Sequence, residues 1–244
     1  MRYFLEVSYK GTNYSGFQIQ HNANTIQAEV EKVLEVFYKE KFNLTGSSRT
    51  DAGVHALQNF FHFDSEINIK PESLYNLNSI LPGDIVLKRI KVVEETAHCR
   101  FGAISREYKY YIYQHKDPFK TDRAFYFPYK IDWELVQGAA EILKEYSDFT
   151  SFSKRNTQVK NFRCRVSESK WLIEDDCLIY TIEANRFLRG MVRALTATML
   201  LVGRKKINIL QFKEIIESKD CTKASFAVPA AGLFLIRVNY PEKE

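Results

Sequence analysis

The strongest constraint on the fold is a change in hydrophobic period on either side of one polar stretch, residues 46–55. Before this stretch, apolar side chains recur at helical spacing at residues 26, 30, 33, 34 and 37. After it, residues 57–64 alternate as a strand does, with Leu57, Asn59, Phe61 and Phe63 sharing a face. A loop between a helix and a strand can hold side chains over the end of a sheet, where scaffolds usually carry functional groups. Residues 46–55 are therefore the first candidate for a functional site.

The rest of the chain shows the same mixture of periods. Alternating segments predict strands at residues 2–10, 85–93, 104–114, 161–173 and 177–185, with a final strand that ends near residue 240. Helical spacing predicts helices at residues 71–80, after a cap at Asp132, and at residues 187–202. Residues 115–131 have the character of a loop. We expect a boundary between residues 104 and 105, which gives an N-terminal half, 1–104, and a C-terminal half, 105–244.

Composition excludes several classes of protein. The chain has 244 residues, long enough for a substantial core, and 45% of them are hydrophobic. The chain contains no run of about 18 apolar residues, so we expect no membrane-spanning helix. The N-terminus has the pattern of a strand rather than of a signal peptide. The four cysteines are scattered without a Cys-x-x-Cys pair. We therefore expect neither a zinc site nor a disulfide framework, and we expect a cytoplasmic protein with no membrane association.

Positive charge is concentrated in the second half of the chain. The net charge is +5, but residues 154–206 carry twelve lysines or arginines against five acids, a net charge of +7. The remaining residues therefore have a net charge of −2. This asymmetry is typical of a protein with an anionic partner such as nucleic acid, although a solvated charged surface explains it equally well.

Within residues 46–55, Arg49 and Asp51 flank Thr50, and Gly53 allows a tight turn behind the acid. From the residues alone, Asp51 has two interpretations: a turn-forming residue whose side chain bonds nearby amides, or a reactive carboxylate. The tyrosines of residues 104–114 suit a packed sheet face, and Arg193 suits the solvated surface of a helix.

Eight segments, in order along nearly the whole chain, resemble the motifs of the tRNA pseudouridine synthase A (TruA) family. The signature is Arg-Thr-Asp-Ala-Gly-Val-His at residues 49–55. Its companions lie at residues 11–18, 77–85, 98–101, 106–110, 148–152, 185–193 and 228–233. The chain departs from the family pattern at a few positions: Cys99 and Val228 replace alanines, and residues 186, 189 and 190 are Arg, Arg and Gly where relatives commonly have small, aromatic or His residues. The two arginines add positive charge beside the site without removing a catalytic group.

The resemblance implies an α+β fold with two related α/β halves that share an antiparallel-rich sheet, helices outside, and a central RNA-binding cleft. It implies that Asp51 is the catalytic residue, that Arg193 pairs with it, and that Tyr108 packs against the target base. Leu233 would line the uracil pocket. Arg49 is suited to holding the phosphate backbone or filling the space that the base vacates, because its guanidinium is a planar fork.

The family's reaction isomerises uridine to pseudouridine, so the resemblance implies a tRNA substrate, at uridines 38, 39 and 40 of the anticodon stem-loop, and a homodimer. A carboxylate can serve as nucleophile or as base in such a reaction, and no metal or other cofactor is needed. Two alternatives remain: a catalytically silent RNA-binding protein or tRNA chaperone on the same scaffold, and a hydrolase that uses Asp51 and His55 around a metal.

Overall fold

The computed structural model describes residues 1–155 and 159–241. The chain forms two compact units: one contains Met1–Ile104 and the residues from Phe234 onward, and the other contains Ser105–Leu233. Within the described residues there are nine strands and five α-helices, and most of the strand pairs are antiparallel. This architecture confirms the predicted α+β fold class.

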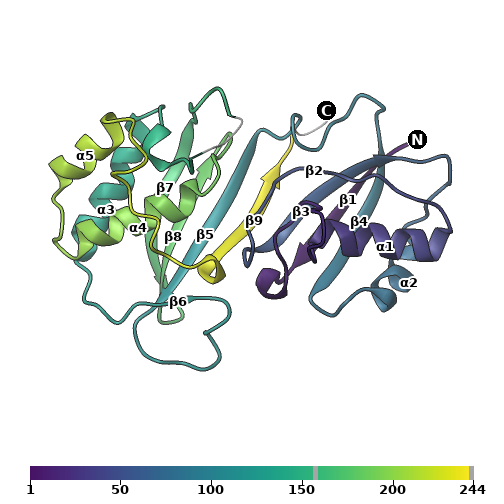
Figure 1. The fold of residues 1–244 in the computed structure, drawn as a ribbon, viewed down its shortest axis with the longest axis horizontal. Coiled ribbons are helices and arrows are strands. Elements are labelled where there is room, and N and C mark those ends of the chain that lie inside the picture. The colour runs from purple at the N-terminus through teal and green to yellow at the C-terminus, as the bar shows by residue number, and fades with distance from the viewer. Residues whose placement is uncertain (156–158, 242–244) are drawn as a thin grey trace. The chain divides into compact units, whose positions relative to one another are not determined.

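The sheet of the first unit is built on three antiparallel strands in the order β4, β1, β3 (Figure 1). Their bounds are Arg2–Tyr9 for β1, His55–Asp64 for β3 and Ile85–Val93 for β4. The short strand β2 (Thr45–Gly46) pairs antiparallel with β3, and β9 (Leu233–Asn239) joins β3 in parallel through Phe234 and Leu235. The first unit is therefore completed by residues from the far end of the chain.

The helices of the first unit are α1 (Ile26–Tyr38) and α2 (Ser73–Ile80), and a short 3-10 helix occupies Gly11–Asn13. Four of the five apolar positions predicted for α1 are buried and the fifth, Phe37, is half-buried, while α2 packs on β4 and α1. Thr25 caps α1, because its hydroxyl accepts a hydrogen bond from the amide of Ala28 at 3.3 Å.

Both faces of β3 are buried over residues 59–63. On one face the ring of Phe61 stacks on Phe17, with centroids 4.6 Å apart. On the other face Tyr240 meets Phe60 edge-on at 5.2 Å. Tyr240, in the segment after β9, thus covers this second face.

The second unit contains a three-stranded antiparallel sheet in the order β5 (Ser105–Tyr113), β8 (Cys177–Ala184), β7 (Val166–Glu174). The short strand β6 (Phe125–Tyr126) joins β5 in parallel. The β7–β8 connection is a two-residue turn at 175–176, and both of its residues have positive φ. Such turns match the twist of the strands that they join.

Three α-helices complete the second unit: α3 (Trp133–Ile142), α4 (Met191–Gly203) and α5 (Ile209–Glu217). Asp132 caps α3 as predicted, accepting a hydrogen bond from the amide of Leu135 at 3.3 Å. Helix α3 packs on β7 and α4 on β5, and all three helices contact one another. Short 3-10 helices occupy Leu143–Glu145, Thr150–Phe152 and Ala230–Gly232.

Helix α4 begins four residues later than its apolar spacing predicts. Gly190 has φ +76°, a left-handed conformation that glycine adopts without steric cost and that the helix interior does not contain. The helix therefore starts at Met191, and Arg189 lies in the preceding turn. Helical spacing from residue 187 would place Arg189 and Arg193 one turn apart on one helix, but only Arg193 lies in α4.

No helix among the described residues is both long enough and apolar enough to span a membrane.

Candidate active site

Asp51 lies in the loop that connects β2 to β3, and its side chain is half-buried. The loop turns directly after it: the amide of Val54 donates to the carbonyl of Asp51 at 3.2 Å, and Gly53 takes φ +77°. A tight turn after Asp51 was predicted from Gly53, and Gly53 does adopt the left-handed conformation that such a turn requires. Arg49 is exposed on the same loop, whereas Thr50 between the two charged residues is buried.

A buried hydrogen-bond network holds the residues that precede Asp51 in the sequence. The hydroxyl of Tyr9 forms a hydrogen bond with the hydroxyl of Thr50 at 2.8 Å. The side-chain amide of Asn59 donates both to that tyrosine hydroxyl, at 3.2 Å, and to the carbonyl of Ser48, at 2.8 Å. Two strands of the sheet, β1 and β3, therefore fix the backbone that presents Asp51.

The segment 11–17 holds the same loop from a second side. The amide of Phe17 donates to the carbonyl of Thr50 at 3.1 Å, and the amide of Gly53 donates to the carbonyl of Tyr14 at 3.3 Å. The hydroxyl of Tyr14 in turn donates to the carboxylate of Asp84 at 2.5 Å. Burial, together with this hydrogen bond, raises the pKa of Tyr14. Three motif segments of the sequence, at 11–18, 49–55 and 77–85, thus meet in one arrangement.

His55 is buried in the core of the first unit. Its Nδ1 atom accepts a hydrogen bond from the amide of Gly11 at 3.1 Å, and its ring stacks on Phe234 with centroids 4.5 Å apart. The one group of three or more potential metal ligands in the described part of the chain includes neither His55 nor Asp51.

Tyr108 lies on the buried face of β5 together with Arg106, Tyr110 and Ile112, as the alternation predicts. The side chain of Tyr108 is 8% exposed, and its ring meets Phe187 edge-to-face at 5.0 Å. Offset or edge-to-face contacts are the preferred geometry of aromatic pairs. Phe187 therefore fixes the orientation of the Tyr108 ring.

Arg193 and the segment that leads to Leu233 are joined in the second unit. Two guanidinium nitrogens of Arg193, Nε and Nη2, donate to the carbonyl of Val228 at 3.0 and 2.7 Å. The hydroxyl of Tyr110 donates to the next carbonyl, that of Pro229, at 2.7 Å. Burial raises the pKa of Tyr110, and the charge of Arg193 acts in the opposite direction. Leu233 itself is buried, four residues beyond Pro229.

The basic segment, which we define as Lys154, Arg155, Lys160 and Arg163, follows the motif at 148–152. Three of its side chains are exposed and that of Lys154 is half-buried. The amide of Lys154 donates to the carbonyl of Arg189 at 2.9 Å, which anchors the start of the segment next to the turn before α4.

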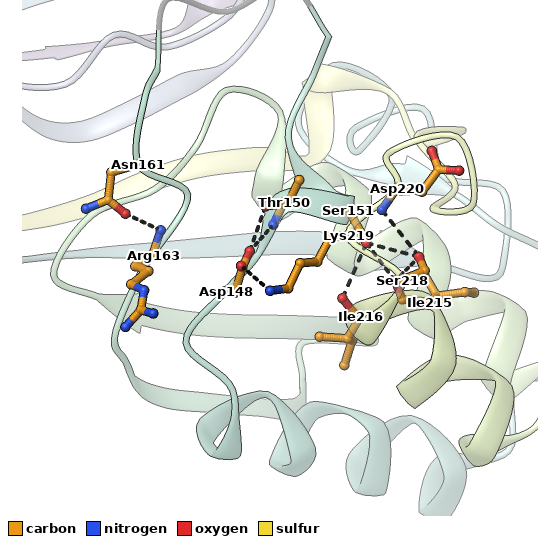
Figure 2. Close-up of polar contacts among 10 residues, drawn as sticks. All are labelled: Asp148, Thr150, Ser151, Asn161, Arg163, Ile215, Ile216, Ser218, Lys219 and Asp220. Atoms are coloured by element: carbon orange, nitrogen blue, oxygen red, sulfur yellow. Dashed lines mark hydrogen bonds and ion pairs between the residues drawn. The ribbon is translucent and has the colours of Figure 1, made fainter.

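The motif before the basic segment is anchored to the end of α5, as Figure 2 shows. The carboxylate of Asp148 accepts hydrogen bonds from Thr150 and forms an ion pair with Lys219 at 3.3 Å. Burial opposes ionisation of Asp148, but these contacts prevail and its pKa is lowered. Ser151 donates to the carbonyl of Ile215 at 2.6 Å. The Arg163 side chain extends away from this cluster (Figure 2).

The structure thus groups the predicted site residues within each unit: Arg49 and Asp51 in the first, and Tyr108, Arg193 and Leu233 in the second. Sequence reasoning missed the residues that hold them, Tyr9, Asn59 and Tyr110. A signal for Asn59 was present, because it is a polar residue at an inward position of an otherwise apolar strand face. Nothing in the sequence indicates that the hydroxyl of Tyr9 bonds to Thr50, forty-one residues away.

Three side chains outside this region could hold a metal ion: His62, His98 and Cys99. The Nδ1 atom of His62 lies 3.1 Å from the sulfur of Cys99. Burial lowers the pKa of His62 to about 4, and the nearby His98 and Arg2 act in the same direction. His62 is therefore a neutral imidazole at physiological pH.

Comparison with known proteins gives a consistent result. A family model described as tRNA pseudouridine synthase matches residues 6–102 and 139–241. The first matched segment contains Asp51, the second contains Arg193 and Leu233, and Tyr108 lies between the two.

Individual relatives match along almost the whole chain. The chain is 43% identical over 244 residues to tRNA pseudouridine synthase A of Parabacteroides distasonis, covering 99% of this chain and 97% of that protein. It is 42% identical over 245 residues to the Porphyromonas gingivalis protein of the same name, covering 98% and 97%. The Staphylococcus aureus protein of that name is 36% identical over 247 residues, covering 100% and 92%.

Proposed function

Because this chain belongs to the tRNA pseudouridine synthase family, isomerases that convert uridine to pseudouridine in tRNA, we propose that it modifies uridines 38 to 40 of the anticodon stem-loop with Asp51 as the reactive group. The observation that supports this proposal is that hydrogen bonds fix the backbone of the loop between β2 and β3, which carries Asp51. A half-buried carboxylate, that of Asp51, follows Thr50 directly, and Thr50 is held by a hydrogen bond with the hydroxyl of Tyr9 and by one from the Phe17 amide. A catalytic group works best when its backbone is fixed before the substrate arrives.

The reaction breaks the bond between N1 of uracil and C1′ of the ribose and forms a bond from C5 to C1′. The uracil gains a proton at N1 and loses one at C5, so no other atom enters or leaves. Asp51 can attack carbon and later depart, as carboxylates do in retaining glycosidases, or it can remove a sugar proton as a base. Both routes begin with an ionised carboxylate. Pairing with the guanidinium of Arg193, as in the family's motif, favours that form.

The target base must leave its stack before it can react, which costs a few kcal/mol. In the proposed complex the ring of Tyr108 supplies a face on which the uracil stacks, and Leu233 lines the pocket on its apolar side. The exposed guanidinium of Arg49 binds the phosphate backbone next to the extruded nucleotide. The basic segment in the second unit contributes phosphate contacts that do not depend on sequence.

A modification map of several unmodified tRNA transcripts, treated with the purified protein in the presence of EDTA, tests the proposal. Pseudouridine at positions 38 to 40 in tRNAs of different sequence is the expected result. Product confined to one sequence context, or found only outside the anticodon arm, would defeat the assignment of positions. Tight tRNA binding without any product would instead identify a silent RNA-binding protein.

We also propose that the active species is a homodimer in the cytoplasm, as the family resemblance implies. Light scattering of the protein as it elutes from a size-exclusion column should then give a mass close to twice the 28.5 kDa of the chain. A monomeric mass at the concentration used in the activity assay contradicts this part of the proposal and leaves the reaction untouched.

A further inference from the structure

His62, His98 and Cys99 come together from two separate parts of the first unit. His62 is on β3, and the other two follow β4 in the segment at 98–101. The ring centroids of His62 and His98 are 4.4 Å apart. Each of the three residues offers one potential ligand atom, and these three atoms all lie within 4.8 Å of one another. The ligands of a tetrahedral zinc ion, at 2.0–2.3 Å from the metal, are separated by roughly 3.3–3.8 Å. Small side-chain movements bridge the difference.

The donor set suits a borderline-soft cation. Two imidazoles and one thiolate are the ligands preferred by Zn²⁺ and by Co²⁺, and three protein ligands leave a fourth position for water. Cys99 is fully buried, His62 nearly so, and His98 is half-exposed. An ion therefore reaches the cluster from the side of His98.

Two features of the surroundings bear on the charge balance. The guanidinium of Arg2 lies close to the cluster, but it is paired with both carboxylate oxygens of Asp64, at 2.8 and 2.7 Å. A thiolate at Cys99 brings one further negative charge to the ion. While no metal is bound, the thiol of Cys99 donates a hydrogen bond to the carbonyl of Thr45, with the sulfur 3.1 Å from the oxygen.

His98 must change its hydrogen bonds to become a ligand. Its Nδ1 atom accepts long hydrogen bonds from the amides of Arg100 and Phe101, at 3.1 and 3.4 Å. Ligation through Nδ1 replaces these two bonds, and ligation through Nε2 moves the ring proton from Nε2 to Nδ1. Either route gives up only weak contacts, because both bonds are at the long end of the hydrogen-bond range.

Although the spacing of the cysteines predicted no zinc site, we propose that His62, His98 and Cys99 bind one zinc-class divalent cation, with water as the fourth ligand, at a site separate from the Asp51 loop. Binding forms three metal–protein bonds and releases one proton from the Cys99 thiol to solvent. The ion ties residues 98–99 to β3, and so stabilises the first unit by mass action.

Cobalt(II) added to the purified full-length protein, after removal of metals with a chelator, tests this site directly. The expected result is one bound Co²⁺ per chain with a thiolate-to-cobalt charge-transfer band, displaced by Zn²⁺. The Cys99→Ala variant should lose that band, and His98→Gln should lose one-to-one binding. The matched control is Cys221→Ala, which removes a partly exposed cysteine from the second unit and should retain the band.

Thermal unfolding separates a binding defect from a folding defect. Metal-free Cys99→Ala and His98→Gln should melt as single transitions, and Zn²⁺ should raise the melting temperature of the wild type and of Cys221→Ala only. No charge-transfer band in the wild-type protein, or a band that survives Cys99→Ala, overturns the proposal. Neither outcome depends on pseudouridine formation, so the site and the proposed reaction fail or stand separately.

Discussion

Asp51 is the single side chain on which the proposed chemistry depends. We predict that Asp51→Asn lowers the rate of pseudouridine formation by at least roughly a thousandfold, because an amide is neither a nucleophile nor a base of comparable strength. Its shape is nearly unchanged, so tRNA affinity should stay within about threefold. Single-turnover assays and a filter-binding titration measure the two quantities.

The control for Asp51→Asn is Asp64→Asn, at the end of β3 in the same unit. Asp64 is mostly exposed, pairs with Arg2, and lies at the opposite end of β3 from the Asp51 loop. Asp64→Asn should therefore keep full activity. Near-wild-type turnover of Asp51→Asn would remove Asp51 from the mechanism.

Tyr108 offers a second test at the scale of one residue. We predict that Tyr108→Phe retains most activity and that Tyr108→Ala loses about 1–3 kcal/mol of transition-state stabilisation, because the ring face is what stacks on the base. Since Tyr108 also packs against Phe187, the alanine variant must be assayed where circular dichroism shows it folded. Equal losses in both variants would mean that the hydroxyl is the important group.

The loop that carries Asp51 is held by neighbouring strands, and Tyr9 links them. We predict that Tyr9→Phe destabilises the protein by about 1–3 kcal/mol, because it leaves the buried side chains of Thr50 and Asn59 without that partner. Urea unfolding measures this loss. The reaction rate should fall as well, because the backbone in front of Asp51 is less firmly held, while tRNA affinity remains.

Tyr146→Phe is the matched control, since its hydroxyl donates at 2.7 Å to Glu217 in an exposed pair of the second unit. Its effect on stability should be below about 0.5 kcal/mol. If Tyr9→Phe behaves like Tyr146→Phe in both assays, the hydroxyl of Tyr9 does not position the loop.

Elements with a regular hydrophobic period were predictable from the sequence. The strands β1, β4, β5 and β8, and the helix capped by Asp132, lie close to where their spacing placed them. An error arose where a single backbone conformation decides, because Gly190 delays the start of α4. Helix α5 was not predicted.

The candidate site was predictable to a different extent. Motif resemblance picked out Asp51, Tyr108, Arg193 and Leu233, whose roles remain predictions. The groups that hold these residues depend on contacts between distant segments, such as that of Tyr110 with the Pro229 carbonyl. Spacing along one element carries no information about such contacts.

Over the whole molecule, the uneven distribution of charge gives a prediction about affinity. Replacing Lys154, Arg155, Lys160 and Arg163 together by glutamine should weaken binding to different tRNAs by a similar factor. The slope of log affinity against log salt should flatten by up to about 4, one for each phosphate that the variant no longer neutralises. Titrations at several salt concentrations measure both.

The control replaces four exposed lysines of the first unit, Lys32, Lys41, Lys70 and Lys91, by glutamine. This variant removes the same charge from the half of the chain that is less basic, and its salt slope should change little. A similar flattening in both variants would mean that only the total charge matters, and that the basic segment has no special place in tRNA binding.

The parallel pairing of β3 with β9 has a consequence for synthesis on the ribosome. The first unit includes Phe234 and the residues after it, so its sheet cannot be completed until those residues have left the ribosome. Domains generally fold as units during translation, N-terminal first, but here the stretch made second, Ser105–Leu233, is the one that can complete itself first. Limited proteolysis of stalled nascent chains should therefore find protection of that stretch before protection of the N-terminal hundred residues. Until β9 has been synthesised, the strand that follows the Asp51 loop lacks its pairing partner on one side.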